Sequence, residues 1–154
     1  MCYTLLVSKG RPRRVIMIKA EYKGYKIEGA TLTLPNGDKL DLTHQPDRRA
    51  IKFKPYGHKM TLYRVVVCIL MGMDSMPSSL EVHHVDLNAD NCDPANLVLL
   101  TKSAHIQAHT LVRNMTLACV RGDFAAGWQA REEYVEFVKN NNMMPKKGCV
   151  DFVK

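Results

Sequence analysis

The sequence lacks the long hydrophobic segment that a membrane-spanning helix requires. Its longest apolar run, residues 65–73, is about half of the roughly 20 residues needed to cross a bilayer. The first residues contain neither a basic stretch nor a long apolar segment of the kind found in secretory signals. We therefore expect no association with membranes and, by default, a location in the cytosol (the host cytoplasm if the chain is phage-encoded).

Cysteines are too few and too scattered to form a scaffold. There are 5 of them, an odd number, and no two form a Cys-x-x-Cys pair. A disulfide framework needs an even set, and a structural zinc knuckle needs closely spaced thiols. The sequence therefore predicts reduced thiols. It also contains no internal repeat.

Acidic residues are scarce in the first 64 positions, which contain 5 Asp and Glu and 14 Lys and Arg. Residues 65–154 contain 10 Asp and Glu and 8 Lys and Arg. A basic excess suits a polyanionic partner, because each neutralised phosphate releases condensed counterions, although solvated lysines are common on ordinary surfaces. The side chains that could contact the phosphates of a nucleic acid are Arg11, Arg13, Arg14, Arg48, Arg49, Lys52 and Lys54.

Short β-type segments dominate this basic part. Strands are predicted at residues 15–18, 25–27, 30–34, 39–42 and 51–54. The sequence Pro-Asn-Gly-Asp at 35–38 is typical of a hairpin turn. A small antiparallel sheet is the simplest interpretation.

Helices and two further strands are expected in the rest of the chain. Thr61 is expected to cap a helix that runs to Leu70, although this valine-rich run would equally suit a buried strand. Strands at 80–85 and 96–100 precede a helix that starts near Thr101 or Ser103 and ends near residue 113. A last helix is expected over 123–140, before a loosely ordered end. Its expected packing positions are Trp128, Tyr134, Phe137 and Val138.

Four of the 6 histidines fall within 27 residues: His83, His84, His105 and His109. His105 and His109 are four apart, so on a helix they lie on one face and can share one metal ion. His83 and His84 would point to opposite faces of a strand, yet both can flank one site. One ring can then bind the ion while the other activates a water beside a phosphate.

The segment 82–109 resembles the motif of the HNH endonuclease family. The residues that carry the resemblance are Val82-His83-His84-Val85-Asp86, Asp90-Asn91, Pro94-Ala95-Asn96-Leu97 and His105-Ile106-Gln107-Ala108-His109. The family folds this motif as a ββα-metal finger, with the ion between two strands and a helix. The resemblance implies a phage-type endonuclease that hydrolyses DNA phosphodiester bonds.

The resemblance also implies catalytic and supporting roles. His84 matches the general base that activates water. Asn96 matches the asparagine of the motif, which braces the loop and helps to orient the catalytic histidine. Asp86 and Asn91 match the loop of the motif, where we expect hydrogen bonds rather than direct chemistry.

One divalent ion is the implied cofactor. By resemblance His83 and His105 are ligands, and His109 is either a third ligand, as in colicin-type members, or a phosphate contact. Many members that nick DNA with magnesium have a carboxylate in place of His83. The resemblance implies Mg²⁺ or Mn²⁺. Because imidazoles favour softer ions and magnesium prefers oxygen ligands, Zn²⁺ and Ni²⁺ are the alternatives.

The predicted class is α+β, with three parts: a basic β-rich region with a short helix (1–79), the HNH ββα-metal motif (80–113), and a C-terminal helix and tail (114–154). The expected partner is DNA, taken as double-stranded; the oligomeric state is not predicted. The competing hypothesis is a metal-stabilised module that binds nucleic acid without cleaving it. A methionine-rich interaction surface is less well supported, because methionines near apolar runs usually fill the core. His44 and His58 receive no role.

Overall fold

Four short antiparallel strands form the N-terminal sheet of the computed structural model, which describes residues 17–45 and 49–144. They are β1 (Lys19–Tyr22), β2 (Tyr25–Glu28), β3 (Thr31–Thr33) and β4 (Lys39–Asp41), adjacent in chain order. Tyr25 and Ile27 of β2 are buried while their neighbours in the strand are exposed, so one face of the sheet packs on the core. The predicted turn at 35–38 joins β3 to β4.

The position of the first strand differs from the prediction. Met17 and Ile18 precede β1, and residues 15 and 16 lie outside the described residues. The two-residue turn at Lys23 and Gly24, with φ angles of 46° and 85°, pairs Tyr22 with Tyr25 and so fixes the register of β1 against β2. The turn chemistry therefore outweighs the β-propensity of the apolar run before it.

A second antiparallel pair leads into the central helix. β5 (Ala50–Lys52) pairs with β6 (Lys59–Thr61), a strand that the sequence pattern did not predict. The valine-rich run forms α1 (Leu62–Met71), so the helix prediction is confirmed. Thr61 occupies the N-cap position, as predicted, but its side chain makes no capping hydrogen bond. The helix ends at Gly72, whose φ of 64° is the left-handed conformation that glycine adopts at low cost.

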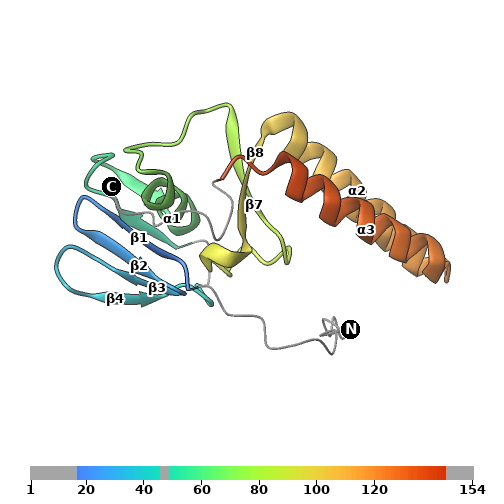
Figure 1. Ribbon diagram of the computed structural model, residues 1–154, viewed down its shortest axis with the longest axis horizontal. Coiled ribbons are helices and arrows are strands. Elements are labelled where there is room, and N and C mark those ends of the chain that lie inside the picture. The colour runs from blue at the N-terminus through green and yellow to red at the C-terminus, as the bar shows by residue number, and fades with distance from the viewer. Residues whose placement is uncertain (1–16, 46–48, 145–154) are drawn as a thin grey trace.

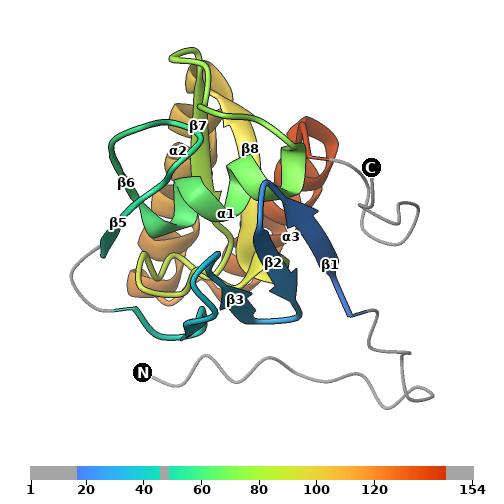
Figure 2. The ribbon, with the colours of Figure 1, turned by 90° about the vertical axis from the view of Figure 1, so that its left-hand side faces the viewer.

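The α1 helix lies between the N-terminal sheet and a third antiparallel pair, β7 (Leu80–His84) and β8 (Leu97–Thr101) (Figures 1 and 2). Its residues 65–70 are all buried. The short 3-10 helix η2 (Pro94–Asn96) precedes β8. The fold is therefore α+β, with α1 at its centre.

Two long helices form a hairpin that projects from the rest of the molecule (Figure 1). These are α2 (Lys102–Val120), which extends beyond its predicted end near residue 113, and α3 (Phe124–Asn141). Tyr134 and Val138 of α3 are buried, and Phe137 packs beside them, as predicted. Trp128 was expected to pack as well, but its side chain is 53% exposed, because the outer half of the hairpin has no neighbouring element among the described residues.

The segment after α3 is more ordered than predicted. The backbone N–H of Met143 donates to the carbonyl oxygen of Leu99 at 2.8 Å, and the Leu99 N–H donates to Oδ1 of Asn142 at 3.1 Å. Met144 is buried in the core. Residues 142–144 are therefore held against β8 and the core, whereas residues 145–154 lie outside the described residues.

No helix among residues 17–45 and 49–144 is long and apolar enough to span a membrane. The described cysteines, Cys68, Cys92 and Cys119, are free thiols. Burial raises the pKa of Cys68 and of Cys92 to about 11, so both thiols remain protonated at neutral pH.

Candidate metal and catalytic centre

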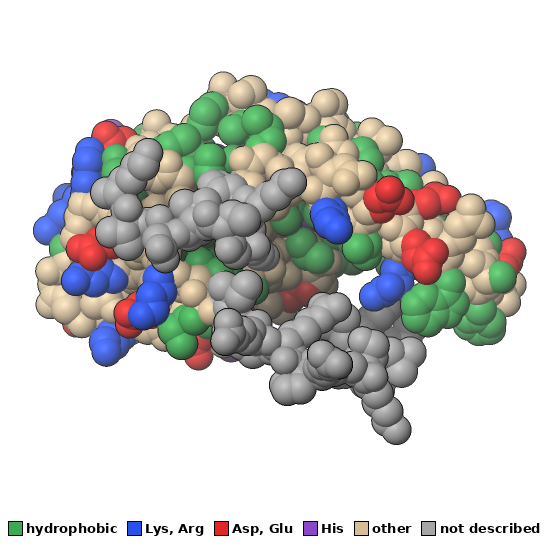
Figure 3. Space-filling view, viewed as in Figure 1, with side chains coloured by type: hydrophobic (Ala, Val, Ile, Leu, Met, Phe, Trp, Pro, Cys, Tyr) green, Lys and Arg blue, Asp and Glu red, His purple; other side chains and the backbone are tan. Residues whose placement is uncertain are grey.

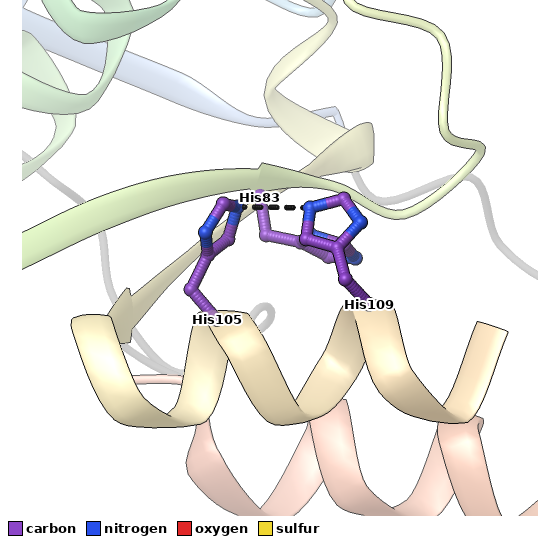
Figure 4. Close-up of side chains that lie close together, drawn as sticks. All are labelled: His83, His105 and His109. Carbon is purple, nitrogen blue, oxygen red and sulfur yellow. Dashed lines mark hydrogen bonds between the residues drawn. The ribbon is translucent and has the colours of Figure 1, made fainter. Parts of the chain in front are cut away.

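Three histidines from two elements meet between β7 and α2. His83 projects from β7, and His105 and His109 project from α2 (Figure 4). One ring nitrogen of each residue lies within 4.8 Å of those of the other two. His83 is 1% exposed, His105 is half-buried and His109 is exposed, so the cluster is open to solvent on one side.

Local structure explains why these residues meet. β7 and β8 pair with His83 opposite Val98, and the chain then turns directly into α2. The turn is fixed by Thr101, whose hydroxyl accepts a hydrogen bond from the Ala104 N–H at 3.2 Å, as a helix cap does. Ala104 and Ala108 are buried, so the helix lies close to the strands. The spacing of four then places both helical histidines over His83.

The surroundings of His83 and His105 favour the neutral form of their rings. Burial, followed by the charges that His109, His105 and His84 would carry, lowers the pKa of His83 to about 4. Burial and then His109 also lower the pKa of His105, against an opposing effect of Glu81. Because only a neutral imidazole has a lone pair to give, this environment keeps both residues in the form that binds metals at neutral pH.

The spacing of the nitrogens fits a divalent ion. Nε2 of His105 and Nε2 of His109 are 3.3 Å apart. Two imidazole nitrogens on one tetrahedral zinc ion are also roughly 3.3 Å apart, since each Zn–N bond is about 2.0–2.1 Å. Three histidine ligands leave a coordination position open, as in catalytic rather than structural zinc sites.

His84 lies beside the cluster but outside the ligand set. Its ring makes an edge-on contact with the ring of Tyr63 from α1, with centroids 5.1 Å apart. His84 nevertheless lines the same hollow, of about 410 Å³, as His83, His105 and His109. The adjacent histidines of β7 thus point in different directions but border one space.

Asn96 braces the loop between β7 and β8. Its Oδ1 accepts from the Asp86 N–H at 2.9 Å, and its Nδ2 donates to Asp86 Oδ1 at 2.8 Å and to the Asn91 carbonyl at 3.0 Å. Nδ2 of Asn91 donates to the other Asp86 oxygen at 2.7 Å. The three side chains form one network that holds the chain immediately after His84.

Tyr134 of α3 is part of the centre, although the sequence pattern indicated only packing. Its hydroxyl is 2.8 Å from Nε2 of His83 and donates to the Val85 carbonyl at 3.1 Å. Burial, and then the charge of Asp86, raises the pKa of Tyr134 to about 12. The residue is 51 positions from His83, so no local motif could have revealed the contact.

The predicted DNA-binding residues are only partly described. Arg11, Arg13, Arg14 and Arg48 lie outside the described residues. Arg49, Lys52 and Lys54 are exposed, and Arg49 hydrogen-bonds to Gln45 at 3.2 Å. None of the described three lines the histidine hollow.

Lysines also gather over the N-terminal sheet, at the left end of Figure 3, but several have acidic partners. Lys19 pairs with Glu28 at 3.8 Å, and Lys26 pairs with Glu21 at 3.7 Å. Both pairs are well exposed, so they contribute little to stability, but they partly neutralise the sheet surface.

Comparison with known proteins gives a match for the central segment of the chain. Residues 66–107 match a family model described as HNH endonuclease. The match starts within α1 and includes His83, His84, Asn96 and His105, whereas His109 and Tyr134 lie beyond it. No curated protein and no solved structure matched the chain.

Proposed function

From the premise that residues 66–107 belong to the HNH endonuclease family, we propose that the protein is a metal-dependent endonuclease that hydrolyses DNA phosphodiester bonds. The observation that carries the proposal is the meeting of His83, His105 and His109 at ligand spacing, with His84 bordering the same hollow. In this proposal β7, β8 and α2 are the ββα-metal finger of the family.

The proposed metal ligands are His83, His105 and His109, whose ring nitrogens lie within 4.8 Å of one another. When bound, one divalent ion supplies Lewis-acid stabilisation of charge on the phosphate and on the leaving oxygen. Three imidazoles suit Zn²⁺, Ni²⁺ or Mn²⁺ better than Mg²⁺, which prefers oxygen ligands. Mg²⁺ is therefore the least favoured of the four ions.

His84 is the proposed general base. It takes a proton from the water that attacks the phosphorus atom, for which a neutral imidazole close to the phosphate is needed. Its neighbour Tyr63 limits the movement of the ring by edge-on contact. The network of Asn96, Asp86 and Asn91 limits the movement of the following backbone, and so positions His84 indirectly.

We further propose that the three sequence regions divide the work. Region 1–79 contacts the DNA through its basic residues, region 80–113 cleaves it, and region 114–154 supports the cleavage centre. This division is supported by the contact of Tyr134 in α3 with His83.

The direct test is cleavage of supercoiled plasmid by metal-stripped protein after addition of Mg²⁺, Mn²⁺, Zn²⁺ or Ni²⁺. We expect metal-dependent conversion to nicked or linear DNA, with Mn²⁺, Zn²⁺ or Ni²⁺ more effective than Mg²⁺. Retained DNA binding without cleavage by any ion would contradict the proposal and would favour the metal-stabilised binding module.

A further inference from the structure

A second hollow adjoins the histidine centre. It has a volume of about 370 Å³, and Tyr56, Lys59, Tyr63 and Arg64 are among the residues that line it. Tyr63 also lines the histidine hollow and contacts His84, so the two spaces share one wall. Within the described parts of the chain, no acidic side chain lines this second hollow.

Two lysines beside this hollow lie opposite each other in neighbouring strands. Lys59 of β6 lies directly opposite Lys52 of β5 in the strand pairing, and both are exposed. Like charges at opposed positions of a sheet destabilise it. Among residues 17–45 and 49–144 neither lysine has an acidic partner, unlike Lys19 and Lys26 of the N-terminal sheet. An anion that lies between them would remove the repulsion.

Aromatic side chains complete the hollow. Tyr56 is 44% exposed, with its ring edge-on to His58 at 5.6 Å. Aromatic rings flanked by cations bind single-stranded nucleic acid, because the rings stack on unpaired bases while the cations hold the phosphates. We propose that this hollow binds an unpaired nucleotide next to the scissile phosphate, with Lys52 and Lys59 toward its phosphate and Tyr56 toward its base. The assignment rests on the proposed function.

The test measures binding rather than cleavage, so it remains informative if the nuclease proposal fails. Metal-free protein is titrated with a fluorescent single-stranded oligonucleotide at several salt concentrations. We expect the variant with Lys52→Gln and Lys59→Gln to bind about 10-fold more weakly at low salt. The slope of log K against log salt should fall by about 1.4, because two phosphate contacts are lost at about 0.7 each. The matched control, Lys19→Gln with Lys26→Gln, should show much smaller changes.

Tyr56 provides an independent arm of the same experiment. Tyr56→Ala should weaken single-strand binding about 10-fold and duplex binding much less, whereas Tyr56→Phe should retain parental affinity. Parental affinity and salt slope in the double lysine variant, or equal losses for single strand and duplex in Tyr56→Ala, would overturn the assignment. Plasmid cleavage without these binding effects would support the nuclease proposal and would contradict the assignment of the second hollow to a nucleotide.

A separate observation concerns how His83 is presented to the metal. The Tyr134 hydroxyl has one hydrogen, and it is donated to the Val85 carbonyl. The hydroxyl oxygen therefore accepts from His83, which requires a hydrogen on Nε2 of that ring.

We infer that Tyr134 is a positioning residue that holds His83 in its Nε2–H form and so leaves Nδ1 as the metal-binding atom. A hydrogen bond to one ring nitrogen commonly fixes which nitrogen binds the ion and how the ring is oriented. This inference rests on the proposed metal site. It also gives α3, outside the family match, a defined part in that site.

Nitrogen NMR of the histidine rings tests the inference without any cleavage. Metal-free parent protein should show His83 protonated on Nε2, and Zn²⁺, a diamagnetic probe, should shift the Nδ1 resonance. Tyr134→Phe should lose the preference for the Nε2–H form and bind Zn²⁺ at least 10-fold more weakly. The control Tyr22→Phe also removes a hydrogen-bonded phenol, which contacts Asp74 at 2.8 Å, and should change neither property.

Two results would overturn the inference about Tyr134. One is protonation of Nδ1 in the metal-free parent, which needs no variant and is unaffected by folding defects. The other is parental Zn²⁺ affinity in a folded Tyr134→Phe protein. Cleavage that fails while the Nε2–H form is present would count against the nuclease proposal alone.

Discussion

Replacing His84 with alanine should reduce the rate of DNA cleavage by at least about 100-fold, the contribution expected of a general base. Metal affinity should stay at the parental value, because His84 lies outside the ligand cluster and faces Tyr63. The measurement is single-turnover cleavage of plasmid at saturating protein, with metal binding followed by calorimetry on the same samples.

The matched control for this prediction is His44→Ala, which removes an exposed histidine from outside both hollows. We expect parental cleavage from the control. Parental cleavage by His84→Ala itself would remove the residue from the role of base. Loss of metal binding in His84→Ala would instead show that the residue acts on the ligand set.

Replacing His105 with alanine should affect metal binding first. The variant loses one of three ligands, so we expect it to bind the preferred ion at least about 100-fold more weakly. At saturating ion, this loss of affinity lowers the stabilisation of the folded protein by the ion by at least about 2.7 kcal/mol. Cleavage should fall in parallel at limiting metal. The measurement is the rise in melting temperature on addition of the ion, which should be large for the parent and small for the variant.

Gln107→Ala is the matched control for His105→Ala, because Gln107 lies on the same helix between the two histidines, is exposed and does not line the hollow. It should keep the stabilisation by metal. Equal metal stoichiometry and equal stabilisation in His105→Ala and the parent would exclude His105 as a ligand. The two histidine variants therefore separate the proposed base from the proposed ligands.

Features set by local sequence were predictable. The spacing of His105 and His109 shows their shared helical face without any tertiary information, and the turn at 35–38 fixes the hairpin of β3 and β4. The helix over 62–71 was favoured, although its composition alone does not separate a helix from a buried strand.

Features set by distant contacts were not predictable. Tyr134 comes to His83 only because α2 and α3 pack as a hairpin. The second hollow, which Tyr56 and Lys59 line, forms only because β6 places Lys59 beside α1. Asn142 was expected in a loose tail, yet its side chain binds the backbone of β8. Each of these contacts depends on the chain folding back over many residues, which a single sequence does not reveal.

The hairpin of α2 and α3 limits which segment of the chain could carry the proposed cleavage centre into another protein. Tyr134 and Val138 share a small hydrophobic cluster with Val98 and Leu100 of β8 and with Ala104 of α2. A graft of residues 66–107 would carry His83, His84 and His105 without His109, would expose this cluster and would leave His83 without its phenol partner. The smallest portable unit therefore runs from α1 to the end of α3, well beyond the segment that matches the HNH endonuclease family model.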